Sequence, residues 1–354
     1  MFMALLGLMA MAAGGGVQPV EQARPRVEVA FVLDTTGSMG GLIEGAKRRI
    51  WSIARQIGEG RPRPDLRIAL VAYRDVRDAY VTQVHPFTAD MDEVYRSLSS
   101  FRAEGGGDTP EHVSAALREA VDSLQWSGPP ALRVVILVGD APPHLDYQDG
   151  FDYRRHVAEA RRRGIVVDAI QCGGDVQTAA VWREIASAGL GHYAQIDSQG
   201  GMNAQVTPYD AELARLGAEL SSTVVISGDA RRQSTSARTL DARRAMPAAV
   251  AAEASGYLAR ADSLAAGDLV DRPVAEQRAE LKQQRAPILA GKSESEALAD
   301  LAARKARRAE LQSKITALSA KRDAALAASA EKDAFDSGVV ARMKERAAGI
   351  GIRY

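Results

Sequence analysis

The stretch VEVAFVLDTTGSMGG, Val27 to Gly41, joins an apolar strand to a helix through a polar turn. Asp34, Thr36 and Ser38 occupy every second position of that turn, so in extended backbone their side chains point the same way. A carboxylate with two neutral hydroxyls offers oxygen ligands to a hard divalent cation. Because this donor set carries little negative charge, a bound ion would keep its affinity for a carboxylate from a partner.

Outward from this stretch, short apolar runs alternate with amphipathic segments as far as about residue 223. The expected strands are 27–33, 66–73, 80–84, 134–138, 165–170 and 192–196, and the expected helices are 43–57, 110–124, 149–163, 175–188 and 209–222. Several strands are continuous runs of Val, Ile and Leu, as expected when helices cover both faces of a sheet. The pattern predicts an α/β fold with a doubly wound, mostly parallel sheet flanked by helices.

Changes in composition divide the chain into four parts. Residues 1–26 form a signal-peptide-like segment and linker, residues 27–226 the sheet domain, residues 227–246 a polar linker, and residues 247–354 a helical, coiled-coil-like C-terminal region. This last region is rich in Ala, Glu, Lys and Arg and shows no convincing strand. Apolar residues spaced by three or four predict a long helix over 293–328, in a helical hairpin that packs on itself or on the first domain.

Composition and motifs exclude several functional classes. The 354 residues include 45 basic and 45 acidic side chains, so no overall charge favours nucleic acid. The single cysteine, Cys172, excludes an internal disulfide framework and a Cys-rich zinc site. The chain contains no GxSxG elbow and no phosphate-binding GxxxxGK[ST] loop. We therefore expect a protein that is not an enzyme.

The N-terminal run MFMALLGLMAMAAGGG has about the length of a signal peptide, with small residues near its end. Cleavage after Ala12 is one option, although no basic residue precedes the run. The run is too short to span a bilayer comfortably, so no stable membrane span is expected in the mature chain. We expect an exported protein, periplasmic or secreted; a cytoplasmic protein with a buried helix is the alternative.

Two further segments carry residues suited to the same chemistry as the first turn. GGGDTPEH, residues 105–112, presents Asp108 and Thr109 on a glycine-rich loop, and in VVILVGDAPPH, residues 134–144, Asp140 ends a core strand. Ligands of doubly wound sheets gather outside the carboxyl ends of the strands. A lone aspartate there is usually a helix cap, but together the three segments predict a metal site. Asp75, at a strand end, and His144, after two prolines, are candidates for its rim.

These segments resemble a known family. DTTGSMG resembles the Asp-x-Thr/Ser-x-Ser element of the metal-ion-dependent adhesion site of von Willebrand factor type A (VWA) domains, and GGGDTPE and LVGDAPPH resemble its second and third elements, closest to the extracellular and bacterial branches. The resemblance implies that Thr36 and Ser38 bind Mg²⁺ or Mn²⁺ directly, whereas Asp34 and Asp140 act mainly through water or by supporting the ligands.

The second loop departs from the Gly-Gly-Thr of many relatives, because Asp108 stands before Thr109. A bound Asp108 carboxylate would raise metal affinity but cancel more of the ion's charge, whereas Thr109 would leave the ion more electrophilic. Both alternatives stay open, with Thr109 preferred.

The expected function is a divalent-metal-dependent adhesion or interaction module. It would capture an acidic side chain or carboxylate of a partner protein through a bound magnesium ion. The alternative, also suggested by the resemblance, is an intracellular scaffold subunit of a chelatase- or ATPase-type assembly.

Overall fold

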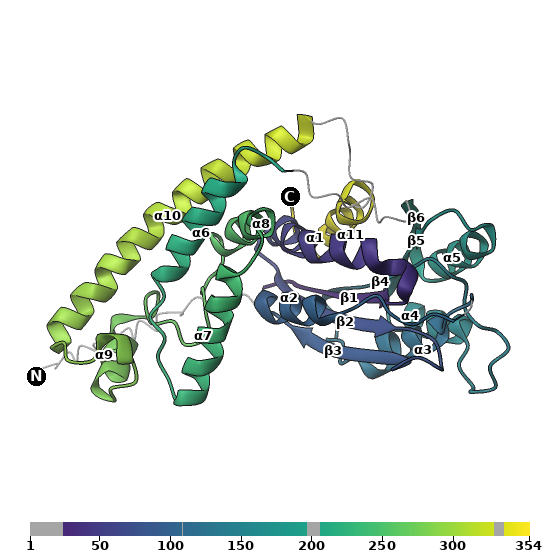
Figure 1. The fold of residues 1–354 in the computed structure, drawn as a ribbon, viewed down its shortest axis with the longest axis horizontal. Helices are drawn as coiled ribbons and strands as arrows, with labels where there is room; N and C mark the ends of the chain where they lie inside the picture. Colours follow the sequence, from purple (N-terminus) through teal and green to yellow (C-terminus); the bar gives the residue numbers. More distant parts are fainter. Residues whose placement is uncertain (1–23, 108, 197–205, 329–335) are drawn as a thin grey trace, which may run out of the picture.

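Six strands form one mixed sheet in the order β3-β2-β1-β4-β5-β6 in the computed structural model (Figure 1), which describes residues 24–107, 109–196, 206–328 and 336–354. The strands are β1 (Arg26–Asp34), β2 (Asp65–Tyr73), β3 (Thr82–Thr88), β4 (Ala131–Gly139), β5 (Val166–Cys172) and β6 (Leu190–Ile196). All neighbouring strands are parallel except β3, an edge strand that runs antiparallel to β2. The predicted fold class is confirmed.

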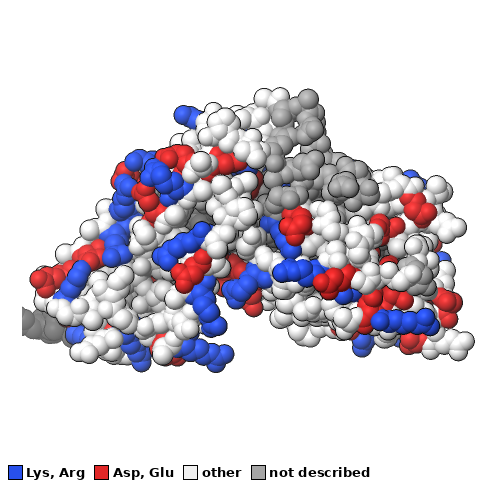
Figure 2. All heavy atoms as spheres, in the orientation of Figure 1, with Lys and Arg blue, Asp and Glu red and all other residues white. Residues whose placement is uncertain are grey.

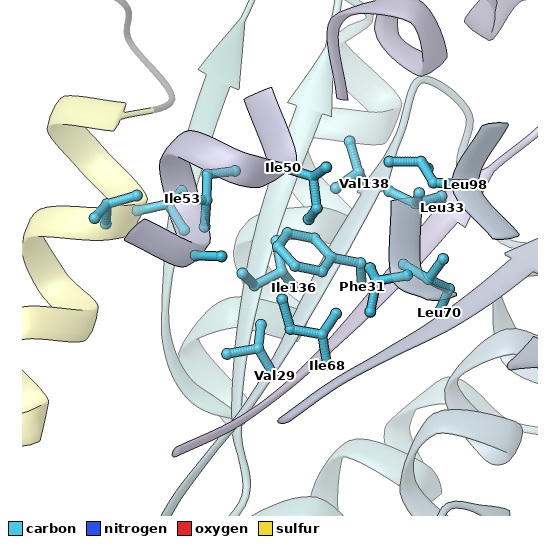
Figure 3. Close-up of a cluster of buried hydrophobic side chains, with 14 of the residues drawn as sticks. Val29, Phe31, Leu33, Ile50, Ile53, Ile68, Leu70, Leu98, Ile136 and Val138 are labelled. Atoms are coloured by element: carbon cyan, nitrogen blue, oxygen red, sulfur yellow. The ribbon is translucent and has the colours of Figure 1, made fainter. Parts of the chain in front are cut away.

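Helices cover both faces of this sheet. They are α1 (Gly40–Gly58), α2 (Met91–Ser100), α3 (Val113–Arg118), which continues into a π-helical turn (Glu119–Ser123), α4 (Tyr153–Arg162) and α5 (Val176–Ala188). Alternate residues of β1 face opposite sides: Phe31 packs with α1 and α2, whereas Val32 packs with α3, α4 and α5. Figure 3 shows the first of these two cores, in which Phe31 lies among Ile50 of α1 and neighbouring strand residues.

Five further helices form a module beside the sheet domain (Figure 1). They are α6 (Asp210–Ser222), α7 (Ala230–Arg244), α8 (Ala248–Leu258), α9 (Val274–Lys282) and α10 (Glu294–Ala328). A core shared by α6, α8 and α10 includes Leu213 and Leu220 of α6 and Leu311 and Ile315 of α10. Leu281 of α9 packs against a separate, smaller cluster that includes Leu301 of α10. The module joins the sheet domain where α8 packs against α1. The long helix predicted over 293–328 is confirmed, and it packs on α6, α8 and α9.

The chain then returns to the sheet domain. A π-helical turn (Asp336–Val340), α11 (Ala341–Ala347) and the last residues pack against α1, with Met343 and Ile352 fully buried in the same core as Phe31. The Tyr354 hydroxyl donates to the Ile57 carbonyl oxygen at 2.9 Å. The sheet domain is therefore completed by residues far beyond the boundary at 226 that composition predicted.

The predicted linker over 227–246 is wrong, because this stretch contains α7. Asp229 caps that helix by accepting from the Arg232 amide. Near its other end, the buried Arg243 guanidinium pairs with Asp92 of α2. The polar composition concealed this helix because its buried arginine, Arg243, is neutralised by a partner distant in sequence.

Two smaller expectations are also corrected. The strand expected over 80–84 lies at Thr82–Thr88, and the helix α2 was not predicted.

The signal-peptide-like segment lies outside the described residues, so export stays a prediction. Within the described ranges, no helix combines the length and apolar character needed to cross a membrane.

Candidate metal centre

Two neighbouring parallel strands bring the predicted metal ligands to one edge of the sheet. Asp34 is the last residue of β1, and Asp140 follows β4, which pairs with β1. Thr36 and Ser38 lie in the turn between β1 and α1. This edge is at the right of Figure 1, where α1 begins, and Figure 2 shows acidic side chains gathered at that end of the molecule.

Asp34 is fully buried at the base of this turn. Its Oδ1 accepts from the Thr36 amide at 2.8 Å and from the Thr36 hydroxyl at 2.7 Å. Its Oδ2 is buried without a hydrogen-bond partner among the described residues. Burial raises the pKa of Asp34 to about 7; hydrogen bonds from Thr36 oppose this shift, and the nearby Asp140 adds to it. A buried oxygen left unpaired is costly, and a cation would stabilise its ionised form.

The two hydroxyls expected to bind an ion directly lie side by side. Thr36 Oγ1 and Ser38 Oγ are 3.4 Å apart. Thr36 is buried, whereas Ser38 is exposed and Asp140 is half-buried. The donors therefore close the protein side of the centre and leave its outer side open to solvent.

The glycine-rich second loop packs directly against this turn. The Gly37 amide donates to the Gly105 carbonyl oxygen at 3.2 Å. Gly106 has a positive φ of 76°, and a Cβ there would lie 3.0 Å from Thr36 Cβ, so the position requires glycine. The Gly106 amide also donates to the Asp78 carboxylate at 3.1 Å. Asp78, which the sequence did not single out, thereby holds the loop.

The choice between the two ligands of this loop stays open. Thr109 is exposed and makes no side-chain hydrogen bond to the part of the chain that the structure describes. Asp108 lies outside the described residues. The structure thus brings Asp34, Thr36, Ser38 and Asp140 to one edge of the sheet and does not place Thr109 or Asp108 as a ligand.

Glu111 is the most important residue that sequence reasoning missed. It is only 3% exposed, and its Oε2 has no hydrogen-bond partner within the described ranges. Burial raises the pKa of Glu111 to about 9, with further contributions from Asp34, Asp75, Asp78 and Asp140. Its amide donates to the Pro142 carbonyl oxygen, and its own carbonyl accepts from the His144 amide, both at 3.0 Å. These long-range backbone contacts hold Glu111 beside the centre, and no local sequence signal indicates them.

The two predicted rim residues lie next to each other. Asp75 Oδ2 accepts from the Tyr147 hydroxyl at 2.6 Å and lies 3.8 Å from His144 Nε2. The His144 ring stacks on Tyr147 with 4.1 Å between centroids. His112 is buried nearby, with its Nε2 2.8 Å from Asp149 Oδ2.

The hydroxyl and carboxylate oxygens at this edge suit a hard cation, but the acidic side chains alone do not provide a complete ligand set. Across the described residues, no three Asp, Glu, His or Cys side chains are arranged to hold a metal ion. The oxygen donors that the structure brings to this edge are the hydroxyls of Thr36 and Ser38 and the carboxylates of Asp34 and Asp140. Such an oxygen-only set suits Mg²⁺ or Mn²⁺, which commonly keep water ligands.

The buried carboxyl groups predict a pH-dependent stability in the absence of metal. The folded-state pKa values of about 7 for Asp34 and about 9 for Glu111 lie above their ordinary values of 3.8 and 4.5. At pH values between the ordinary and the folded-state pKa of each group, the folded state therefore binds more protons than the unfolded state. The free energy of unfolding should fall as pH rises from about 4 to about 9. Urea unfolding in EDTA at pH 5, 7 and 9 measures this slope, which Glu111→Gln should reduce. A stability that rises over the same window would contradict the assignment.

Comparison with known families identifies the segment of the chain that carries these residues. Residues 28–146 match the family model of the von Willebrand factor A domain. This range runs from β1 to the loop after β4 and contains all three predicted elements of the centre. The match confirms that the chain contains a VWA domain.

Two curated relatives each match about a third of the chain. The human von Willebrand factor A domain-containing protein 7 is 34% identical over 119 residues, which cover 34% of this chain and 12% of that protein. The α-protein kinase vwkA of Dictyostelium discoideum is 32% identical over 119 residues, covering 33% of this chain and 19% of that protein. The solved SpRpn10 VWA domain aligns with a TM-score of 0.37 and 14% identity, over 52% of this chain and 96% of that one. The chain thus spans less than a fifth of the length of these two curated relatives.

Proposed function

We propose that this protein is a non-enzymatic interaction module that captures an acidic side chain or carboxylate of a partner protein through a bound Mg²⁺ or Mn²⁺ ion. Thr36 and Ser38 would hold the ion, Asp34 and Asp140 would support it, and Thr109 or Asp108 would complete the site. The observation that carries the proposal is the unpaired Asp34 Oδ2, buried beneath two adjacent hydroxyls of which one is exposed.

The charge of the donor set supports capture of an acid. The hydroxyls of Thr36 and Ser38 are neutral, and hydrogen bonds from Thr36 already occupy one oxygen of Asp34. A divalent ion held mainly by neutral donors keeps much of its charge. The open outer side then admits a carboxylate, which is the hard, negatively charged ligand that such an ion prefers.

The VWA domain also supports this proposal, since such domains mediate protein interactions. Location outside the cytoplasm remains part of the proposal, and residues 1–12 are its test: the mature protein should lack them. The alternative, an intracellular scaffold of a chelatase- or ATPase-type assembly, gains no specific support from the described residues and stays a prediction.

We expect Ser38→Ala to weaken metal-dependent capture by roughly 10- to 100-fold while the fold stays intact, because it removes an exposed metal ligand and no core contact. The measurement uses the full chain and a panel of peptides, each with one Glu and a Gln twin. Glu peptides should bind in Mg²⁺ and be released by EDTA.

Ser234→Ala is the matched control, because Ser234 is exposed on α7 in the helical module. It should leave peptide binding unchanged. Equal binding of the Glu and Gln peptides, or binding that persists in EDTA, would contradict the proposed function.

A further inference from the structure

We propose that the metal-binding end selects an isolated acidic residue flanked by apolar residues, and that Val76, Leu145 and Val176 supply the apolar contacts. This inference rests on the proposed function, because the selected acid is the one that the ion would hold. It adds which kind of residue the partner should carry on either side of that acid.

Three exposed apolar side chains lie on the loops around the centre. Val76 is 45% exposed, Leu145 is 66% exposed and Val176 is 79% exposed. A single exposed valine or leucine is ordinary on a protein surface. These three, however, come from three separate segments, which follow β2, β4 and β5 at the same edge of the sheet. Their common location points to a shared role.

The strand order places the metal centre between these side chains. In the order β2-β1-β4-β5, the ends of β1 and β4 carry Asp34 and Asp140, and they lie between the segments of Val76 and Val176. The Thr178 hydroxyl donates to the Asp140 carbonyl oxygen at 3.2 Å, which ties the start of α5 to the centre. Val176, the first residue of α5, is thereby held beside Asp140.

Leu145 is held on the other side by contacts of its own loop. The preceding residue, His144, donates its amide to the Glu111 carbonyl oxygen at 3.0 Å and stacks on Tyr147. Tyr147 donates to Asp75, the neighbour of Val76 in sequence. Leu145 therefore follows His144, and Val76 follows Asp75. The His144 Nε2 and Asp75 Oδ2 atoms lie 3.8 Å apart. Apolar contacts fixed in this way lose little conformational freedom when a partner binds.

This arrangement gives a physical reason for selecting apolar neighbours. Apolar residues of the partner would cover the three exposed side chains and exclude water around the ion and its carboxylate. Excluding water strengthens the attraction between opposite charges and is the usual role of the contacts around a binding hot spot. A polar flanking sequence would leave the three apolar side chains in water.

The charge of the same end disfavours a run of acids. Asp75, Asp78 and Asp140 lie close enough to Glu111 for their negative charges to raise its pKa, and Figure 2 shows further acidic side chains at this end. Only the acid bound to the ion would have its charge neutralised. A second or third partner acid would meet like charge, which costs affinity and improves selectivity.

The test compares peptides that share a scaffold and differ at three central residues: Leu-Glu-Leu, Ser-Glu-Ser, Glu-Glu-Glu and Leu-Gln-Leu. Binding to the full chain in Mg²⁺ is measured by isothermal titration calorimetry. We expect Leu-Glu-Leu to bind at least about tenfold more tightly than the other three. The double variant Leu145→Ser/Val176→Ser should reduce this preference to about twofold.

Val274→Ser is the matched control, because Val274 is 57% exposed at the start of α9, in the helical module. It should keep the full preference. Equal binding of the three Glu peptides would overturn this inference and leave the proposed function standing. Failure of every Glu peptide to bind in Mg²⁺ would overturn both, and so would tight binding of Leu-Gln-Leu.

Discussion

Asp34→Asn is expected to weaken Mn²⁺ binding by roughly 10- to 100-fold and, at pH 8 in EDTA, to increase the free energy of unfolding by about 1 kcal/mol or more. The two effects have opposite signs for the same reason. The buried carboxylate is costly without a cation, as its pKa of about 7 indicates, and it is useful only when a cation is present. The asparagine oxygen can still accept the two hydrogen bonds from Thr36.

Mn²⁺ titration and urea unfolding of the full chain measure these two effects. Asp241→Asn is the control, since Asp241 forms only an exposed pair with Arg244 on α7, and both quantities should stay at their wild-type values. If Asp34→Asn kept the wild-type Mn²⁺ affinity, Asp34 would have no part in the centre. If the variant were less stable than the wild-type protein in EDTA, the buried Asp34 carboxylate would not be destabilising in the absence of metal.

Arg322→Met is expected to lower the free energy of unfolding by about 3–5 kcal/mol. Arg322 of α10 pairs with Asp210 of α6 and Glu253 of α8, and all three side chains are almost completely buried. Removing the guanidinium breaks the ion pairs that it forms with both buried carboxylates. The three helices that these residues join form the centre of the helical module, so the loss should appear as a lower urea midpoint.

Arg307→Met on the same helix is the matched control. Arg307 also pairs with two carboxylates, Glu219 and Glu310, but all three groups are largely or partly exposed. This variant should cost less than about 1 kcal/mol. Adding Asp210→Asn and Glu253→Gln to Arg322→Met should recover much of the loss, because no buried charge then remains. Equal losses for Arg322→Met and Arg307→Met would show that burial of the ion triad does not matter.

The sequence predicts well those elements whose formation depends on residues close together in the chain. The strand, turn and helix around Asp34, Thr36 and Ser38 were predictable because their apolar spacing and turn residues are local. The long helix α10 was predictable for the same reason. The position of Asp140 followed from a general rule, that parallel strands bring their carboxyl ends to one edge.

What the sequence did not predict depends on distant partners. Helix α7 looked like a linker because the partner of Arg243, Asp92, is 151 residues away. The burial of Glu111 results from backbone contacts with Pro142 and His144 in another loop. The return of Ile352 to the core beside α1 leaves no periodic signal in a short C-terminal segment.

The most direct test of the central claim is whether a bound ion keeps an open position that a carboxylate fills. Mn²⁺ bound to the full chain can be followed by the relaxation of water protons, which reports water molecules on the ion. We predict that the wild-type protein binds Mn²⁺ and that a Leu-Glu-Leu peptide reduces the relaxation enhancement, whereas Leu-Gln-Leu does not. Absence of bound Mn²⁺, or an enhancement that the Glu peptide leaves unchanged at saturation, would contradict the metal-dependent capture of an acid.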